Sequence, residues 1–244
     1  MAILDVLNER DELRGALGRH SVMLGALVLM LFALPLLDWA PGRGARFPIL
    51  FCLVLLAAVY VNRTQRWILW LAVVFGFGAV SGLAIEQATG VDAARIVADI
   101  LGVALLAVTT LVLLNTLVKT RTVQLDTIIG GVCVYLLLGL CYAVVYRLVI
   151  DLDPGAILQG GTALVAAPED ASALPARLLY FSLVTLTTVG FGDITPQTEL
   201  AQMLSATEAV TGQLYLAIFI ARMMTLYLTS ELSRRGGDGP IEPV

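Results

Sequence analysis

Charged residues are scarce in this chain of 244 residues. They make up 14% of it, whereas 59% of the residues are hydrophobic and the mean hydropathy is +0.89. A soluble domain has about 25% charged and 45–50% apolar residues. The composition therefore excludes an ordinary soluble domain and predicts a protein of the lipid bilayer. The net charge of −4 has little meaning for a protein that lies mostly in lipid, and we expect no nucleic-acid partner.

Histidine and cysteine are scarce as well. The single histidine, His20, lies at the edge of the first apolar segment, and Cys52, Cys133 and Cys141 lie inside apolar segments. We interpret the cysteines as small buried hydrophobic residues, and not as a disulfide framework or a metal site. An intramembrane enzyme would need a placed nucleophile and base, and the chain has no Gly-x-Ser-x-Gly motif. We therefore expect neither an enzyme nor a cofactor.

Six apolar segments alternate with polar ones. They are Ser21–Leu37, Phe47–Val61, Trp67–Ile85, Ile96–Val118, Thr127–Ile150 and about Met203–Leu228. A membrane-spanning helix needs about 17–25 residues, so Phe47–Val61 is marginal. Basic residues ahead of the first segment are also typical of a signal peptide. The segment after it, Asp38-Trp39-Ala40-Pro41, is a poor cleavage site, so we expect six transmembrane helices.

The basic residues predict how these helices are oriented. With the N-terminus inside, ten Lys and Arg residues fall on the inner side and five on the outer side. The inner set is Arg10, Arg14, Arg19, Arg63, Arg66, Lys119, Arg121, Arg222, Arg234 and Arg235, and the outer set is Arg43, Arg46, Arg95, Arg147 and Arg177. Because inner loops carry the excess of Lys and Arg, we expect a multi-pass protein of the plasma (inner) membrane with both termini in the cytoplasm.

A shorter apolar stretch, Leu174–Thr187, lies between the fifth and sixth spans. It is too short to cross a bilayer and fits a re-entrant helix, with Pro175 suited to the first turn. The preceding loop, Asp151–Ala173, carries four acidic residues and no basic one. These acids either raise the local concentration of cations or merely keep the loop soluble. The C-terminal end of the short helix carries a partial negative charge, which favours a cation.

The residues after this helix, Thr188-Val189-Gly190-Phe191-Gly192-Asp193, have the types that a backbone cation site requires. Successive carbonyls line one axis when left- and right-handed dihedrals alternate, and Gly190 and Gly192 adopt the left-handed ones without strain. A Gly-x-Gly alone is often only a turn, but six matched residues between two apolar helices favour the site. The segment resembles the potassium-channel selectivity filter, with Phe191 in place of the usual Tyr.

The resemblance implies the ligands and the assembly. The expected K⁺ ligands are backbone carbonyls together with the Thr188 hydroxyl, and the residues are Thr188, Val189, Gly190 and Phe191. Gly192 completes the filter. Non-helical backbone at membrane depth needs a protein surround, and one chain supplies one filter strand. The family implies a homotetramer with the filter loop between the fifth and sixth helices.

Other positions match the family in part. Tyr180 and Asp193 correspond to residues that hydrogen-bond to each other and support the filter. Val184 stands where some relatives carry Glu. Glu208 lies within the last span, where ionisable groups are costly and usually functional. We expect it either to pack behind the pore helix or near the cavity and tune conduction or pH response, or to make a structural hydrogen bond to a neighbouring Thr.

The last span contains candidates for a hinge and a gate. Gly212 stands at the family's hinge position, although close helix packing explains a glycine there equally well. Ile220, Met224 and Leu228 recur every four residues. They would form an apolar constriction that closes by dewetting, or else pack against lipid or other helices.

The first part of the chain departs from the voltage-gated pattern. Its fourth span, Ile96–Val118, has no basic residue, and its one charge is Asp99, so we predict weak voltage dependence. The expected domains are a cytoplasmic segment (1–20), a four-helix module (21–118), a linker (119–126), a pore domain (127–230) and a short cytoplasmic tail (231–244). The tail is too short for a cytoplasmic ligand-binding domain.

These features predict an all-α membrane protein that passes K⁺ down its gradient. Two alternatives stay open. One is a weakly selective cation channel, because selectivity depends on filter rigidity as well as on sequence. The other is a membrane sensory or structural subunit that does not conduct.

Overall fold

The computed structural model describes residues 19–36, 46–62, 78, 81, 92–120, 125–164 and 173–237. Their helices are α2 (Arg19–Leu36), α3 (Arg46–Asn62), α5 (Asp92–Lys119), α6 (Leu125–Leu152), α7 (Leu174–Leu186) and α8 (Glu199–Gly237). Their strands are β1 (Ile157–Gln159), β2 (Thr162–Ala163) and β3 (Ile194–Pro196). The predicted span Trp67–Ile85 lies outside the described residues except for two positions, as do residues 1–18 and 238–244.

Three of the helices contain stretches that are long and apolar enough to cross a membrane. These stretches are Ile96–Lys119 in α5, Leu125–Leu152 in α6 and Glu199–Thr229 in α8. The other helices hold shorter apolar stretches, His20–Leu34, Ile49–Ala58 and Leu174–Leu186. A mostly helical chain with three candidate spans agrees with the predicted all-α membrane protein, and the total of six spans stays a prediction.

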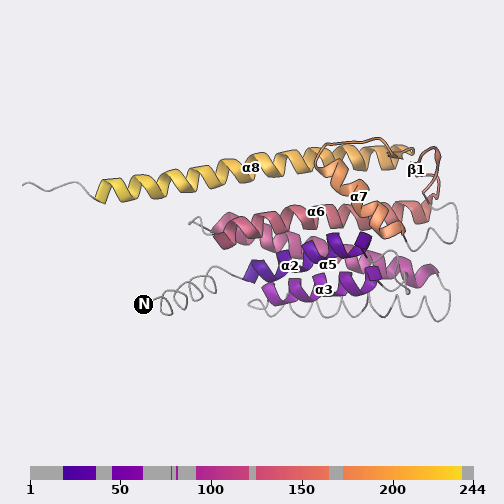
Figure 1. Cartoon of the computed structure of the whole chain (residues 1–244), viewed down its shortest axis with the longest axis horizontal. Helices are drawn as coiled ribbons and strands as arrows, with labels where there is room; N and C mark the ends of the chain where they lie inside the picture. Colours follow the sequence, from indigo (N-terminus) through magenta and orange to yellow (C-terminus); the bar gives the residue numbers. More distant parts are fainter. Residues whose placement is uncertain are drawn as a thin grey trace, which may run out of the picture.

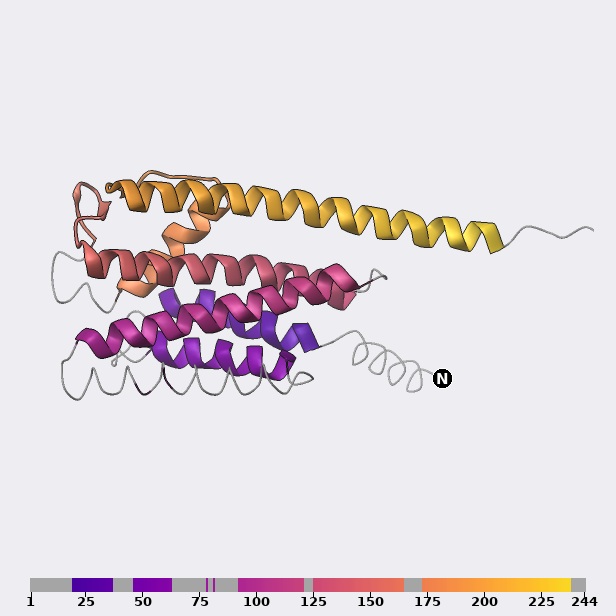
Figure 2. The same cartoon turned by 180° about the vertical axis from the view of Figure 1, so that it is seen from behind.

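Helix α6 lies at the centre of the molecule. It contacts α2 and α5 on one side and α7 and α8 on the other, as Figures 1 and 2 show from opposite directions. α7 lies obliquely between α6 and α8, and α8 extends well beyond the other described helices at its C-terminal end (Figure 1). The arrangement leaves one long side of α8 without a covering helix.

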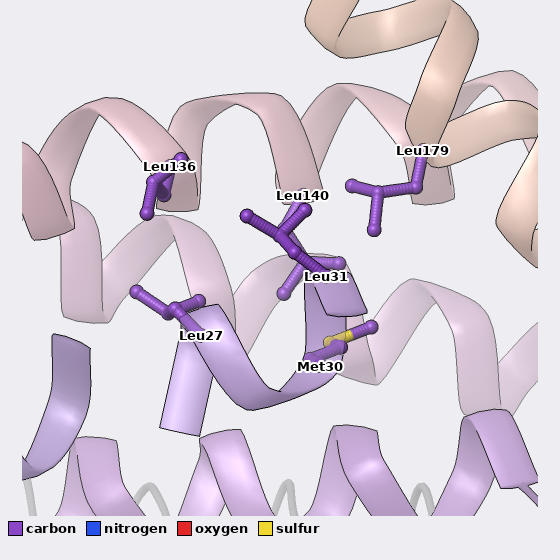
Figure 3. A pocket seen from close by; sticks show the side chains of 6 residues that line it. All are labelled: Leu27, Met30, Leu31, Leu136, Leu140 and Leu179. Atoms are coloured by element: carbon purple, nitrogen blue, oxygen red, sulfur yellow. The ribbon is translucent and has the colours of Figure 1, made fainter. Parts of the chain in front are cut away.

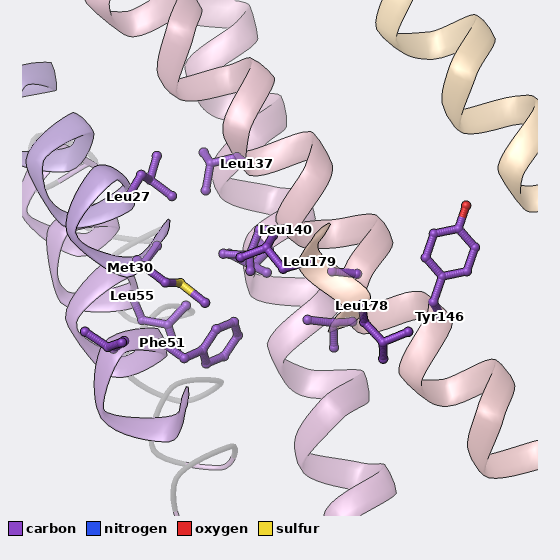
Figure 4. Close-up of a cluster of buried hydrophobic side chains, with 14 of the residues drawn as sticks. Leu27, Met30, Phe51, Leu55, Leu137, Leu140, Tyr146, Leu178 and Leu179 are labelled. Carbon is purple, nitrogen blue, oxygen red and sulfur yellow. The ribbon is translucent and has the colours of Figure 1, made fainter. Parts of the chain in front are cut away.

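The core joins the first helices to α6 and α7. Leu27 and Met30 of α2 and Phe51 of α3 are buried beside Leu140 of α6 and Leu178 of α7 (Figure 4). Burial of a large apolar side chain in a soluble protein contributes about 1.5–3 kcal/mol. Lipid is itself apolar, so in a membrane these contacts act mainly through close packing.

Polar contacts connect the helices at several heights. Arg147 of α6 pairs with Asp99 of α5 at 3.0 Å. At one end of α6, Asp126 lies 2.7 Å from Nδ1 of His20 on α2. Arg222 of α8 donates hydrogen bonds to the carbonyls of Val118 and Thr120, at the C-terminal end of α5. Cations near a helix C-terminus are stabilised by its partial negative charge.

A small antiparallel sheet lies after α6, which the sequence analysis did not predict. The strand order is β2-β1-β3, and Leu158 pairs with Ala163 on one side and Thr195 on the other. Gly160 and Gly161 form the hairpin turn with φ of +57° and +85°. A two-residue turn with both φ values positive matches the right-handed twist of paired strands. Part of the expected irregular loop 151–173 is therefore a hairpin.

Candidate functional site

The C-terminal end of α7 points at Thr188–Asp193, which we call the filter segment. Pro175 lies in the first turn, where its missing N–H is no loss. The helix approaches α6 closely at Gly139, because a Cβ there would lie 2.8 Å from Cδ2 of Leu183. It is 13 residues long, which is too short to cross a bilayer. The short helix between α6 and α8 thus has the position predicted for Leu174–Thr187.

The last turn of α7 binds the amides of the filter segment. The carbonyl of Val184 accepts hydrogen bonds from the N–H groups of Val189 at 3.0 Å and Gly190 at 3.3 Å, and the carbonyl of Thr185 accepts one from Thr188 at 2.9 Å. In a planar trans peptide the C=O points opposite to the N–H of the next residue. The carbonyls of Thr188 and Val189 therefore both point away from α7, toward the same side.

The backbone of the filter segment has a positive φ at every second residue. Thr188, Gly190 and Gly192 have φ of +60°, +57° and +79°, whereas Val189 and Phe191 between them do not have positive φ. The two glycines have the conformation that their sequence positions predict. A β-branched residue in this region costs about 1–3 kcal/mol and persists only where its surroundings hold it. At Thr188 the hydrogen bond to Thr185 is one such constraint.

The filter segment is not covered by its own chain. Val189 is 53% exposed and Phe191 is 70% exposed. The described part of one chain therefore offers these two side chains no packing partner that covers them.

Asp193 ends the segment and is held from two directions. Its side chain lies close enough to Tyr180 of α7 to interact with it, and the supporting hydrogen bond that the resemblance implies stays a prediction. Its backbone carbonyl accepts a hydrogen bond from the N–H of Gly160 in the hairpin at 3.2 Å. The hairpin and β3 thus fix the chain immediately after the filter segment, a role that the sequence analysis missed. The Gly-Gly pair at 160–161 was the signal for it.

Glu208 is completely buried among three helices. Its Oε1 lies 2.5 Å from the hydroxyl of Ser182 on α7, and Tyr146 on α6 donates a hydrogen bond to Oε2 at 2.6 Å. Ser182 is also 2.7 Å from the carbonyl of Gly139. The carboxyl therefore joins α6, α7 and α8. Its partners are a serine and a tyrosine, and not the neighbouring Thr considered above.

Gly212 marks the closest approach of α8 to α7. A Cβ at this position would lie 2.2 Å from the carbonyl oxygen of Leu186, the last residue of α7. The hydroxyl of Tyr135 donates a hydrogen bond to the same oxygen at 3.1 Å. Helix α8 continues through Gly212, so the close-packing explanation accounts for the glycine in this structure. The hinge role stays a prediction.

The three gate candidates on α8 lie on its exposed surface. Ile220, Met224 and Leu228 are each more than half exposed, and their role as a gate stays a prediction.

Gln213, which was not predicted as a site residue, donates a hydrogen bond from Nε2 to Oγ1 of Thr188 at 3.1 Å. A polar side chain directly after Gly212 in an apolar span was the signal for it.

A pocket between α2, α6 and α7 has no comparable chemistry. Its lining consists of leucine and methionine side chains, from Leu27, Met30, Leu31, Leu136, Leu140 and Leu179 (Figure 3). None of these side chains offers a charge or a hydrogen bond. Within the described ranges there is also no cluster of three His, Cys, Asp or Glu residues that would hold a metal ion. The filter segment is the candidate site.

Comparison with known proteins agrees with this site. Residues 134–229 match the model of a protein family described as "Ion channel". Comparisons with curated proteins and with solved structures gave no match. The matched range contains most of α6, all of α7, the filter segment and most of α8. The match supports an ion channel family for this part of the chain and, with it, a channel protein that is not an enzyme.

Proposed function

We propose that this protein is a potassium-selective channel that conducts K⁺ passively, with Thr188-Val189-Gly190-Phe191-Gly192 as its filter. The observation that carries the proposal is the alternating hand of this backbone, with positive φ at every second residue. The amides of Val189 and Gly190 are bound to α7, so carbonyls remain free on the opposite side. Such carbonyls replace the water shell of a cation.

The proposed K⁺ ligands are the carbonyls of Thr188, Val189, Gly190 and Phe191 together with the hydroxyl of Thr188. The C-terminal end of α7 lies beside them and adds its partial negative charge. K⁺ is the permeant ion here and no cofactor is proposed. The multi-pass placement in the plasma membrane, with both termini cytoplasmic, belongs to the same proposal.

The proposed assembly is a homotetramer. One chain supplies one wall of carbonyls, and a ring needs several. In support, only 6% of the residues in an 18-residue apolar window of α8 are buried by its own chain, against 50% in the corresponding window of α6. The exposed filter side chains and the uncovered side of α8 both belong to the stretch of chain that follows α7. Copies of the chain that share an axis would cover both.

The reversal potential of the purified protein in planar bilayers tests this proposal. With K⁺ on one side and Na⁺ on the other, we expect reversal near the K⁺ equilibrium potential. Reversal near zero with measurable current would instead mean a weakly selective cation channel.

Glycine variants provide a matched control for this measurement. Gly190→Ala places a Cβ on a residue with φ of +57°, which strains the filter, so we expect selectivity to fall. Gly25→Ala on α2 meets nothing within 4 Å, and its selectivity should equal that of the wild type. Equal selectivity in both variants would contradict the assignment of the filter.

A further inference from the structure

Gln213 lies beside the inner end of the filter segment. The residue before it, Gly212, touches the carbonyl of Leu186 so closely that no side chain fits. This contact brings the following turn of α8 next to Thr188. Both Gln213 and Thr188 are exposed in the single chain, so the pair faces the open side of the segment and not the core.

The contact involves an oxygen that the proposed function assigns to the ion. Nε2 of Gln213 donates its hydrogen bond to Oγ1 of Thr188 at 3.1 Å. A hydroxyl oxygen has two lone pairs, and the amide occupies one of them. The amide hydrogens also carry partial positive charge close to the place where a cation would bind. The amide and the cation therefore share the same oxygen, and the partial positive charge of the amide opposes the charge of the cation.

The neighbouring hydroxyl groups of Thr187 and Tyr135 are hydrogen-bonded to other backbone carbonyls. The hydroxyl of Thr187 points back into α7 and lies 2.7 Å from the carbonyl of Leu183. The hydroxyl of Tyr135 is engaged with the carbonyl of Leu186. Gln213 is uncharged, so its effect on the ion is local and independent of pH.

We propose that Gln213 is a specificity-determining residue that weakens cation binding at the Thr188 end of the filter by holding the Thr188 hydroxyl. The proposal rests on the proposed channel function. Conduction requires a site strong enough for an ion to enter and weak enough for it to leave. In a ring of four chains, four amides would keep the innermost site weak and so speed the exchange of ions with the inner solution.

The test uses Gln213→Leu, which keeps the approximate length of the side chain and removes its donor. The matched control is Gln202→Leu on the same helix, which removes a hydrogen bond to the carbonyl of Gln197 away from the filter. The probe is Ba²⁺, a divalent cation of nearly the same size as K⁺, added to the inner side of channels in planar bilayers.

We expect Gln213→Leu to tighten inner Ba²⁺ block by at least about two- to tenfold, the range of a single net hydrogen bond, because each of the four chains loses one. Gln202→Leu should leave the block unchanged. Unchanged or weaker block in Gln213→Leu, in a protein whose wild type selects K⁺, would overturn the proposal. Failure of the wild type to select K⁺ would overturn the proposed function instead, and the reversal potential distinguishes the two results.

A double-mutant cycle separates this role from a merely structural one. Thr188→Ala removes the shared oxygen, so adding Gln213→Leu to it should change Ba²⁺ binding no further. Calorimetric titration of Ba²⁺ into the purified proteins gives the same cycle if Thr188→Ala does not conduct. A full effect of Gln213→Leu without the Thr188 hydroxyl would overturn the proposal. A purely structural residue would change thermal stability and leave ion affinity as it was.

Discussion

At the scale of residues, α7 is held by a buried carboxyl group. Glu208 reaches Ser182 on α7 and Tyr146 on α6, and the ring of Tyr146 packs edge-on against Phe181 at 4.9 Å between centroids. Buried polar groups are stable only when their hydrogen bonds are made. Val184, which the resemblance places where some members of the family carry Glu, contributes its backbone carbonyl to the amides of Val189 and Gly190. The acid that packs behind α7 in this structure comes from α8.

Two substitutions of Glu208 should separate the effect of its hydrogen bonds on stability from the effect of its charge on current. Glu208→Ala leaves two buried hydroxyls without this partner, at about 1–3 kcal/mol for each unsatisfied group, so we expect a clear fall in the unfolding temperature. Glu208→Gln keeps the shape and the acceptor but has no titratable proton. It should keep most of the stability and change the dependence of current on pH.

Thermal unfolding in detergent and currents recorded over a pH series measure these two effects. Ser205→Ala provides a control, because Ser205 lies 3.2 Å from the same Tyr146 hydroxyl but does not touch the carboxyl group in the described contacts. Currents and pH dependence that are identical in Glu208→Gln and the wild type would leave Glu208 with a structural role only.

At the scale of elements, α5 lacks what a voltage sensor needs. Between Arg95 and Lys119 it carries no basic residue, and its acid, Asp99, is paired with Arg147 of α6. This ion pair joins α5 to α6, and the contact of Arg222 joins the C-terminal end of α5 to α8. Both contacts fasten α5 to neighbouring helices rather than offer charges that move in a field.

We therefore predict weak voltage dependence. Moving one elementary charge through the membrane field is worth about 2.3 kcal/mol per 100 mV, and α5 has no array of such charges to move. The conductance–voltage curve in symmetric K⁺ should rise over a broad range, with an apparent gating charge below about one per chain. A steep sigmoidal curve would contradict this prediction and point to charges outside α5.

The hairpin formed by β1 and β2 is the other element with a clear structural role, because it holds the end of the filter segment. The Gly160 N–H holds the carbonyl of Asp193, while β1 pairs with β3 directly after it. The segment is therefore fixed at both ends, by the last turn of α7 at Thr188 and by the sheet at Asp193. Such double fixation is what a strained residue such as Thr188 requires.

At the scale of the whole molecule, the described part of the chain leaves a large apolar surface uncovered on α8. α6 is enclosed by other helices, whereas α8 presents large apolar side chains such as Leu214 and Ile218 on its uncovered surface. The filter backbone faces the same open region. An extended apolar surface of this kind is covered by lipid or by protein, and non-helical backbone at this depth requires protein.

We predict that the purified protein contains four chains. Native mass spectrometry from a mild detergent should give four times the chain mass of 26.0 kDa, in addition to bound lipid. Chemical crosslinking should yield dimer, trimer and tetramer bands and no larger species. A protein that conducts K⁺ as a monomer would contradict both the assembly and the ring of carbonyls.

The sequence by itself determined the features that depend on local chemistry. Apolar length predicted the helices that the structure describes at 19–36, 46–62, 92–119, 125–152 and 199–237. Most ends are shifted by a few residues, but the last helix continues nine residues beyond the predicted end at Leu228. The short apolar stretch before Thr188 predicted α7, and Gly190 and Gly192 predicted the positive φ values. These features follow from length in a bilayer and from the freedom of a residue without Cβ.

Only the tertiary structure decided which distant groups meet. The partners of Glu208, the contact of Gly212 with the end of α7 and the hydrogen bond from Gln213 to Thr188 join residues of different elements. Neither hydropathy nor spacing encodes the rotation of one helix about its axis relative to another. That rotation depends on how whole helix surfaces pack, and in this protein it determines which polar side chain lies beside the filter.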